Sequence, residues 1–144
     1  MGAVARIVEL LRLDPDLKFR VGVGTVTVEP RTADGFPVSL TEGTDGWVVT
    51  FGVEFGGWHE HFTSEDEALD RFAFGLSDRC RLRVRYRGAC PYRWTLEERT
   101  ESGWRVVGTT SQRVVSFWRR PRDEYHQNAV FRGAEPSAPP DPVS

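Results

Sequence analysis

Large apolar residues stand at every second position in two neighbouring segments of the chain, 36–41 and 47–55. This alternation is typical of strands that bury one face. The segment 43–46 between them is rich in turn residues, and a turn there pairs Leu40 with Val49. Both apolar sets then share one face, so the pattern predicts an antiparallel hairpin.

The next segment predicts a second hairpin. The Gly-Gly pair at 56–57 suits a two-residue turn, because such turns require positive φ at their central positions. A turn at this point pairs Phe51 with Phe62. It also places Glu54 opposite His59 on the polar side of the strands.

The segment 19–30 predicts one further strand, and its valines change face near residues 24–25. We interpret this change as a β-bulge, which inserts one extra residue into a strand. Apolar residues at helical spacing predict two helices, over 3–13 and 64–77. Ser64 is the expected N-cap of the second helix.

The remaining pattern predicts further strands separated by short turns, which favours antiparallel pairing. These strands cover 79–87, 92–98, 104–110 and 113–118, with a short one near 129–131. The expected fold is α+β: one curved antiparallel sheet of about six to eight strands, one central helix packed on its apolar face, and an N-terminal helix. We expect residues 1–132 to form a single domain and the Pro-rich residues 133–144 to form a disordered tail.

Composition narrows the class of protein. The chain has 144 residues, of which 39% are hydrophobic and 12% aromatic, enough for a core and too many for a wholly disordered chain. It contains no apolar run of about 18 residues, and charges interrupt the segment 1–16, so we expect neither a membrane span nor a signal peptide. The expected location is cytoplasmic, and Cys80 and Cys90 are expected to be free thiols.

Charge is unevenly distributed along the chain. Residues 1–78 contain 6 basic and 14 acidic side chains, whereas residues 79–122 contain 12 basic and 3 acidic ones. Of the 19 basic residues 18 are arginines, a bias typical of a GC-rich, bacterial-like genome, so the bias itself does not indicate phosphate binding. The segregation indicates either an interaction surface or attraction between two parts of the fold.

One strand of the basic segment has an arginine at every second position, and the next strand adds one more: Arg79, Arg81, Arg83, Arg85, Arg87 and Arg93. The five arginines of the first strand should project from one side of a sheet. The simplest interpretation is a solvated face in which nearby glutamates relieve repulsion. The alternatives are docking on an acidic protein surface or a second copy, and binding of nucleic acid.

Nucleic-acid binding has the least support from the sequence. Proteins that bind nucleic acid through a sheet usually expose aromatic rings among the basic residues. Strand alternation places Tyr86, Tyr92 and Trp94 on the core side instead. We therefore expect a non-catalytic domain that binds a protein partner, or associates with itself, through the arginine-bearing face.

A second function remains open from the sequence, that of a metal-dependent enzyme or metal-binding protein. His59 and His61 lie two residues apart on one strand face, and Glu54 should lie opposite His59. Two imidazoles and a carboxylate can bind a divalent metal. The pattern is unspecific, because a surface ion pair between Glu54 and His59 has the same sequence. We therefore expect no cofactor, with a divalent metal as the alternative.

Overall fold

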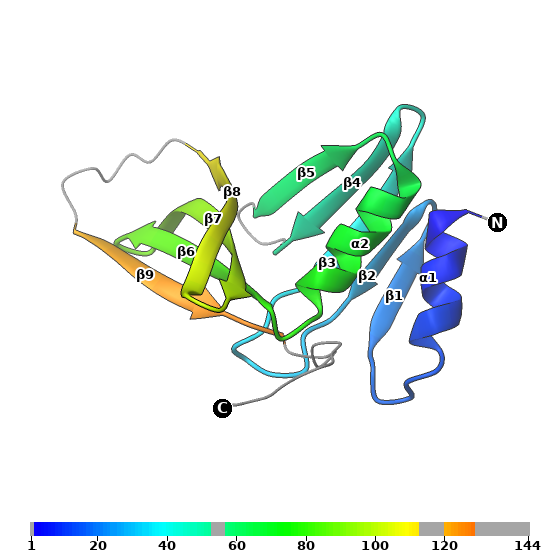
Figure 1. Ribbon diagram of the computed structural model, residues 1–144, viewed down its shortest axis with the longest axis horizontal. Coiled ribbons are helices and arrows are strands. Elements are labelled where there is room, and N and C mark those ends of the chain that lie inside the picture. Colours follow the sequence, from blue (N-terminus) through cyan, green and yellow to red (C-terminus); the bar gives the residue numbers. More distant parts are fainter. Residues whose placement is uncertain (1, 53–56, 113–119, 129–144) are drawn as a thin grey trace.

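The computed structural model describes residues 2–52, 57–112 and 120–128 (Figure 1). These residues form two helices and two antiparallel sheets, which confirms the α+β class. The elements, in chain order, are α1 (Ala3–Leu11), β1 (Phe19–Gly22), β2 (Thr25–Val28), β3 (Val38–Gly43), β4 (Gly46–Phe51), β5 (Trp58–Phe62), α2 (Glu65–Gly75), β6 (Cys80–Arg87), β7 (Cys90–Thr100), β8 (Gly103–Ser111) and β9 (Pro121–His126).

The strands form two sheets where the sequence predicted one. The first sheet has the order β1-β2-β3-β4-β5, and the second has the order β8-β7-β6-β9. The chain leaves the edge strand β5, passes through α2 and begins a new set of hairpins (Figure 1). Since β6 pairs with β7 on one side and with β9 on the other, it has no free edge with which to join the first sheet.

The two predicted hairpins of the first sheet have different outcomes. Leu40 pairs with Val49, as the sequence predicted. Phe51 pairs with Trp58 rather than Phe62, so the predicted two-residue turn at 56–57 is wrong. The connection between β4 and β5 is longer, and residues 53–56 within it lie outside the described residues.

The segment predicted as one bulged strand is a hairpin. β1 and β2 pair antiparallel, with Val21 opposite Val26. The turn between them contains Gly24, whose φ of 67° is a left-handed conformation that glycine adopts without strain. The change of face along the valines therefore results from a reversal of the chain, which the sequence interpretation took for a bulge.

The last described strand was not predicted. β9 contains mostly polar and charged residues, and its strand conformation depends on pairing with β6. The predicted strands at 113–118 and 129–131, and the predicted tail at 133–144, lie outside the described residues.

Both helices pack on the first sheet, and one core connects them to the second. α1 contacts β2 and β3, and α2 lies across β3 and β4 (Figure 1). Buried side chains of the helices, such as Ile7, belong to the same cluster as Phe51 of the first sheet and Leu82 and Trp94 of the second. Within the described residues, no helix is long and apolar enough to cross a membrane.

α2 begins with a clear local cause, and its last residue packs closely on the first sheet. The Oγ atom of Ser64 accepts a hydrogen bond from the backbone N–H of Glu67, which confirms the predicted N-cap. Gly75 ends the helix directly above Phe51. A Cβ atom added at Gly75 would lie 2.5 Å from the ring of Phe51, which is closer than van der Waals contact allows.

Substitution at this contact tests how tightly α2 packs. Gly75→Ala should lower the free energy of unfolding by about 1–2 kcal/mol, because overpacking outweighs the better helix propensity of alanine. Urea denaturation of both proteins measures this difference. In the control Gly43→Ala, the added Cβ lies no closer than 3.6 Å to another atom, so the change should be smaller. A Gly75→Ala variant as stable as the native protein would contradict this packing.

Candidate functional site

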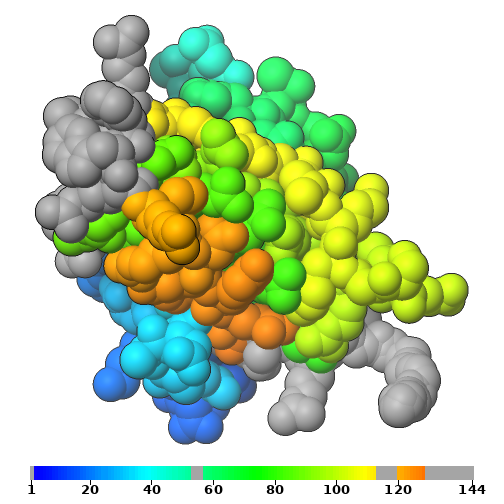
Figure 2. All heavy atoms as spheres, turned by 90° about the vertical axis from the view of Figure 1, so that its left-hand side faces the viewer, coloured from blue at the N-terminus to red at the C-terminus, as the bar shows by residue number. Residues whose placement is uncertain are grey.

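The alternating arginines of β6 lie on the outer face of the second sheet. Leu82 and Val84 point from β6 into the core. Arg81, Arg83 and Arg85 alternate with them along the strand and lie on the opposite side. In Figure 2 the strands β9, β6, β7 and β8 lie beside one another on the side turned to the viewer. We call this outer surface the arginine face; its arginines are Arg81, Arg83, Arg85, Arg87, Arg93 and Arg99.

A buried carboxylate lies at the centre of the arginine face. Glu97 of β7 is only 5% exposed, and the Nε atom of Arg81 donates a hydrogen bond of 2.6 Å to its Oε1 atom. The Nη2 atom of Arg83 lies 3.7 Å from the other oxygen. One carboxylate therefore forms ion pairs with two arginines. Of the glutamates expected to relieve repulsion on this face, Glu97 lies on it, whereas Glu98 lies on the opposite side of the sheet.

A second carboxylate comes from β9. Asp123 lies opposite Arg85 and accepts two hydrogen bonds from it, from Nε at 2.8 Å and from Nη2 at 3.2 Å. These bonds hold the pKa of Asp123 below its ordinary value, and they raise the pKa of Arg85. The sequence interpretation missed Asp123 because β9 has no apolar alternation to mark it as a strand.

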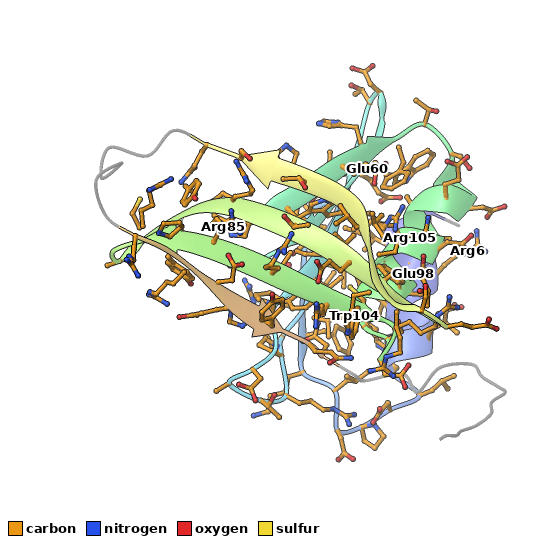
Figure 3. All side chains as sticks on the ribbon, turned by 60° about the vertical axis from the view of Figure 1, so that its left-hand side comes forward. Arg6, Glu60, Arg85, Glu98, Trp104 and Arg105 are labelled. Carbon is orange, nitrogen blue, oxygen red and sulfur yellow. The ribbon has the colours of Figure 1, made fainter. Side chains whose placement is uncertain are left out.

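Aromatic rings also lie on the arginine face. Of the three rings predicted on the core side, Trp94 and Tyr86 are there, and the prediction is wrong for Tyr92. The guanidinium carbon of Arg81 lies 4.3 Å from the ring centre of Trp104 and 4.3 Å from that of Tyr125. Arg99 lies 5.2 Å from the same Trp104 ring. Figure 3 shows Trp104 and Arg85 toward opposite ends of this face. Each such cation–π contact contributes about 0.5–1 kcal/mol at exposed sites.

Tyr92 shows why the alternation failed. The register of β6 and β7 shifts between Arg85 and Tyr86, so Tyr92 is an extra residue at a bulge. Its ring lies 5.4 Å from the guanidinium carbon of Arg87 and 5.8 Å from that of Arg93. Tyr92 is buried, yet it lies outside the core cluster that contains Trp94. The bulge therefore places Tyr92 among the arginines.

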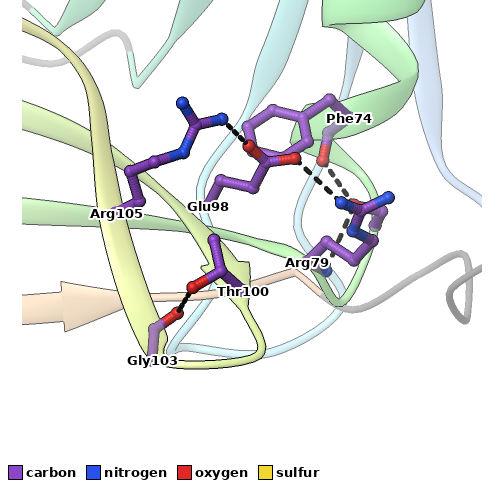
Figure 4. A network of polar contacts seen from close by, with 7 residues as sticks. Phe74, Arg79, Glu98, Thr100, Gly103 and Arg105 are labelled. Atoms are coloured by element: carbon purple, nitrogen blue, oxygen red, sulfur yellow. Dashed lines mark hydrogen bonds and ion pairs between the residues drawn. The ribbon is translucent and has the colours of Figure 1, made fainter.

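Arg79 is separate from the arginine face, contrary to prediction. It precedes β6 in a turn, and its Nη2 atom donates a 2.9 Å hydrogen bond to Glu98. Glu98 pairs with Cys80, on the side of the sheet opposite to Glu97, and also bonds Arg105 (Figure 4). The strand alternation thus holds for Arg81, Arg83 and Arg85, and it does not extend back to Arg79.

The arginine face keeps a surplus of positive charge. Among the described residues it has six arginines against two carboxylates, those of Glu97 and Asp123. The acidic segment 1–78 builds α1, α2 and the first sheet, so the charge segregation of the sequence corresponds to the two sheets. Such a field attracts anionic groups, and salt weakens it.

The predicted metal ligands come together only in part. The rings of His59 and His61 lie 6.3 Å apart on β5, and both residues are exposed. His59 pairs with Thr50, so the predicted pairing with Glu54 is wrong; Glu54 itself lies outside the described residues. Among the described residues, no three His, Cys, Asp or Glu side chains are grouped closely enough to hold a metal ion.

Both cysteines are free, as the sequence predicted. Cys80 is buried, and burial raises the pKa of its thiol well above the ordinary value. Cys80 is therefore not poised to act as a nucleophile.

No protein-family model, curated protein or solved structure matches the chain.

The bond between Arg85 and Asp123 predicts a dependence of stability on pH. Because the folded pKa of Asp123 lies below its ordinary value of 3.8, the unfolded state binds more protons as the pH falls. The contribution is complete above about pH 5 and is lost as the pH falls through the folded pKa. Asp123→Asn should therefore lose less free energy of unfolding than the native protein between about pH 5 and pH 2.

Urea denaturation at several pH values measures these slopes. Asp45→Asn, at an exposed turn position, is the matched control for the same change of charge. Equal slopes in Asp123→Asn and the native protein would show that the bond does not shift this titration.

Proposed function

We propose that the arginine face binds an acidic protein surface. The observation that carries this proposal is the surplus of arginines over carboxylates on one face of a four-stranded sheet. Arg81, Arg83 and Arg85 are held by Glu97 and Asp123, so their positions are set before a partner arrives. Arg93 and Arg99 are backed by aromatic rings. Preorganised charges reduce the entropy lost on binding.

A protein partner fits the contacts of this face better than nucleic acid does. Nucleic-acid bases stack on exposed aromatic faces, whereas Arg81 already lies against both Trp104 and Tyr125. Carboxylates bind the outer edges of guanidinium groups and leave these stacks intact. The aromatic rings thus support the arginines in our proposal, rather than serving as a platform for bases.

A second copy of the chain is a specific form of such a partner. The first turn of α2 carries three acidic residues, Glu65, Asp66 and Glu67. Arg6 partly neutralises this charge, since its Nη1 atom lies 2.6 Å from the Oε2 atom of Glu65. Association of this acidic region with the arginine face of another copy would be favoured at low salt.

A titration with two anionic probes tests the proposal. A short fluorescent peptide of alternating Glu and Ser should bind the native protein at low salt, and added salt should weaken it. A thymidine oligonucleotide of equal formal charge should bind more weakly. The double variant Arg93→Glu with Arg99→Glu should weaken peptide binding at least about tenfold, because it replaces two positive charges of the arginine face with negative ones that repel the peptide.

The matched control reverses two exposed cations outside the arginine face, Arg12→Glu with Lys18→Glu, and should keep most of the affinity. Sedimentation of the same proteins shows whether the native chain self-associates. Equal loss in both double variants would mean that only net charge matters. Tighter binding of the oligonucleotide would favour nucleic acid, and either result contradicts the proposal.

A further inference from the structure

The inner face of the second sheet borders a cleft of about 570 Å³. β6 and β7 provide one wall, and the segment that connects β2 to β3 provides much of the other. The described residues that line the cleft are Arg20, Glu29, Pro30, Gly35, Phe36, Pro37, Gly52, Leu82, Val84, Tyr86, Ala89, Pro91, Trp94 and His126. The volume is within the range of small-molecule sites, about 300–1,000 Å³.

The lining has more apolar than polar surface. Phe36, Tyr86 and Trp94 contribute aromatic rings, and prolines add rigid apolar surface between them. Arg20 and Glu29 both line the cleft and form an ion pair with each other, so together they add no net charge to it. An apolar lining with few polar groups is the usual composition of a site for an organic ligand.

Trp94 lies between this cleft and a second hollow. The second hollow, of about 410 Å³, shares Trp94 and Gly52 with the first, and it is lined on its other side by polar residues such as Thr50, His59 and Thr110. The indole of Trp94 therefore borders both hollows. A ligand in either hollow would change the surroundings of this ring.

His126 provides a polar group in the apolar cleft. Its Nε2 atom lies 3.7 Å from a carboxylate oxygen of Glu124, while its Nδ1 atom is buried and has no hydrogen-bond partner among the described residues. An unpaired buried nitrogen costs about 1–3 kcal/mol. His126 lines the cleft, so a polar group on a ligand bound there would lie near this imidazole.

We propose that this cleft binds a small organic molecule with an aromatic ring and a single polar or anionic group. The ring would pack against Phe36, Tyr86 and Trp94, and the polar group would reach His126. The site lies on the inner face of the sheet whose outer face carries the arginines, so the proposal does not depend on the function proposed for them.

The dye anilinonaphthalene sulfonate is a suitable probe, because it has aromatic rings and one sulfonate. It should bind the native full chain saturably at one site and change the fluorescence of tryptophan. Ala89→Phe places a ring in the cleft from an exposed turn position, so it should weaken binding at least about tenfold without unfolding the protein. Ala5→Phe, on the exposed side of α1, is the matched control and should bind normally.

A second variant separates the cleft from the arginine face, because a sulfonate can also bind arginines. Arg93→Glu with Arg99→Glu should keep the affinity for the dye. Loss of dye binding in this variant, equal binding by Ala89→Phe, or no saturable binding to the native chain would each overturn the proposal. Amide chemical shifts of Gly35, Ala89 and His126 should move on binding, whereas those of Arg99 and Trp104, which line neither hollow, should not.

Discussion

The constraint on which the second sheet depends is the repulsion among arginines on one strand face. Neighbouring arginines on such a face are about 7 Å apart, and two like charges at that distance repel by about 0.6 kcal/mol in water and about 2.4 kcal/mol at an effective dielectric of 20. Glu97 opposes this repulsion from the neighbouring strand, where it meets both Arg81 and Arg83. Asp123 does the same for Arg85 from the other side.

Short sequence patterns correctly predicted the strand pairings that depend on contacts between residues close together in the chain. The pairing of Leu40 with Val49 follows from a short turn and an apolar alternation, both visible in the sequence. The partner of Arg85 could not be found in this way, because Asp123 lies 38 residues away in a strand that only pairing with β6 stabilises. Trp104 could have been placed, since a turn at 100–103 puts it directly opposite Arg99.

The remaining wrong predictions of the fold come from single inserted residues and from reversals of the chain. The bulge at Tyr92 moves one ring from the expected core side to the arginines, and alternation alone cannot reveal such an insertion. The same strand, β6, has arginines on one face and residues of the cleft, such as Leu82 and Tyr86, on the other. The two proposed sites therefore lie back to back on one sheet.

The central claim is that Glu97 stabilises the arginine face through its charge, and a double-mutant cycle tests it most directly. The free energy of unfolding would be measured for the native protein, Arg81→Gln, Glu97→Gln and the double variant. Because Glu97 is buried and its bond to Arg81 is short, we expect a coupling free energy of about 1–3 kcal/mol. A coupling below about 0.3 kcal/mol would show that the two side chains act independently, which would contradict the account.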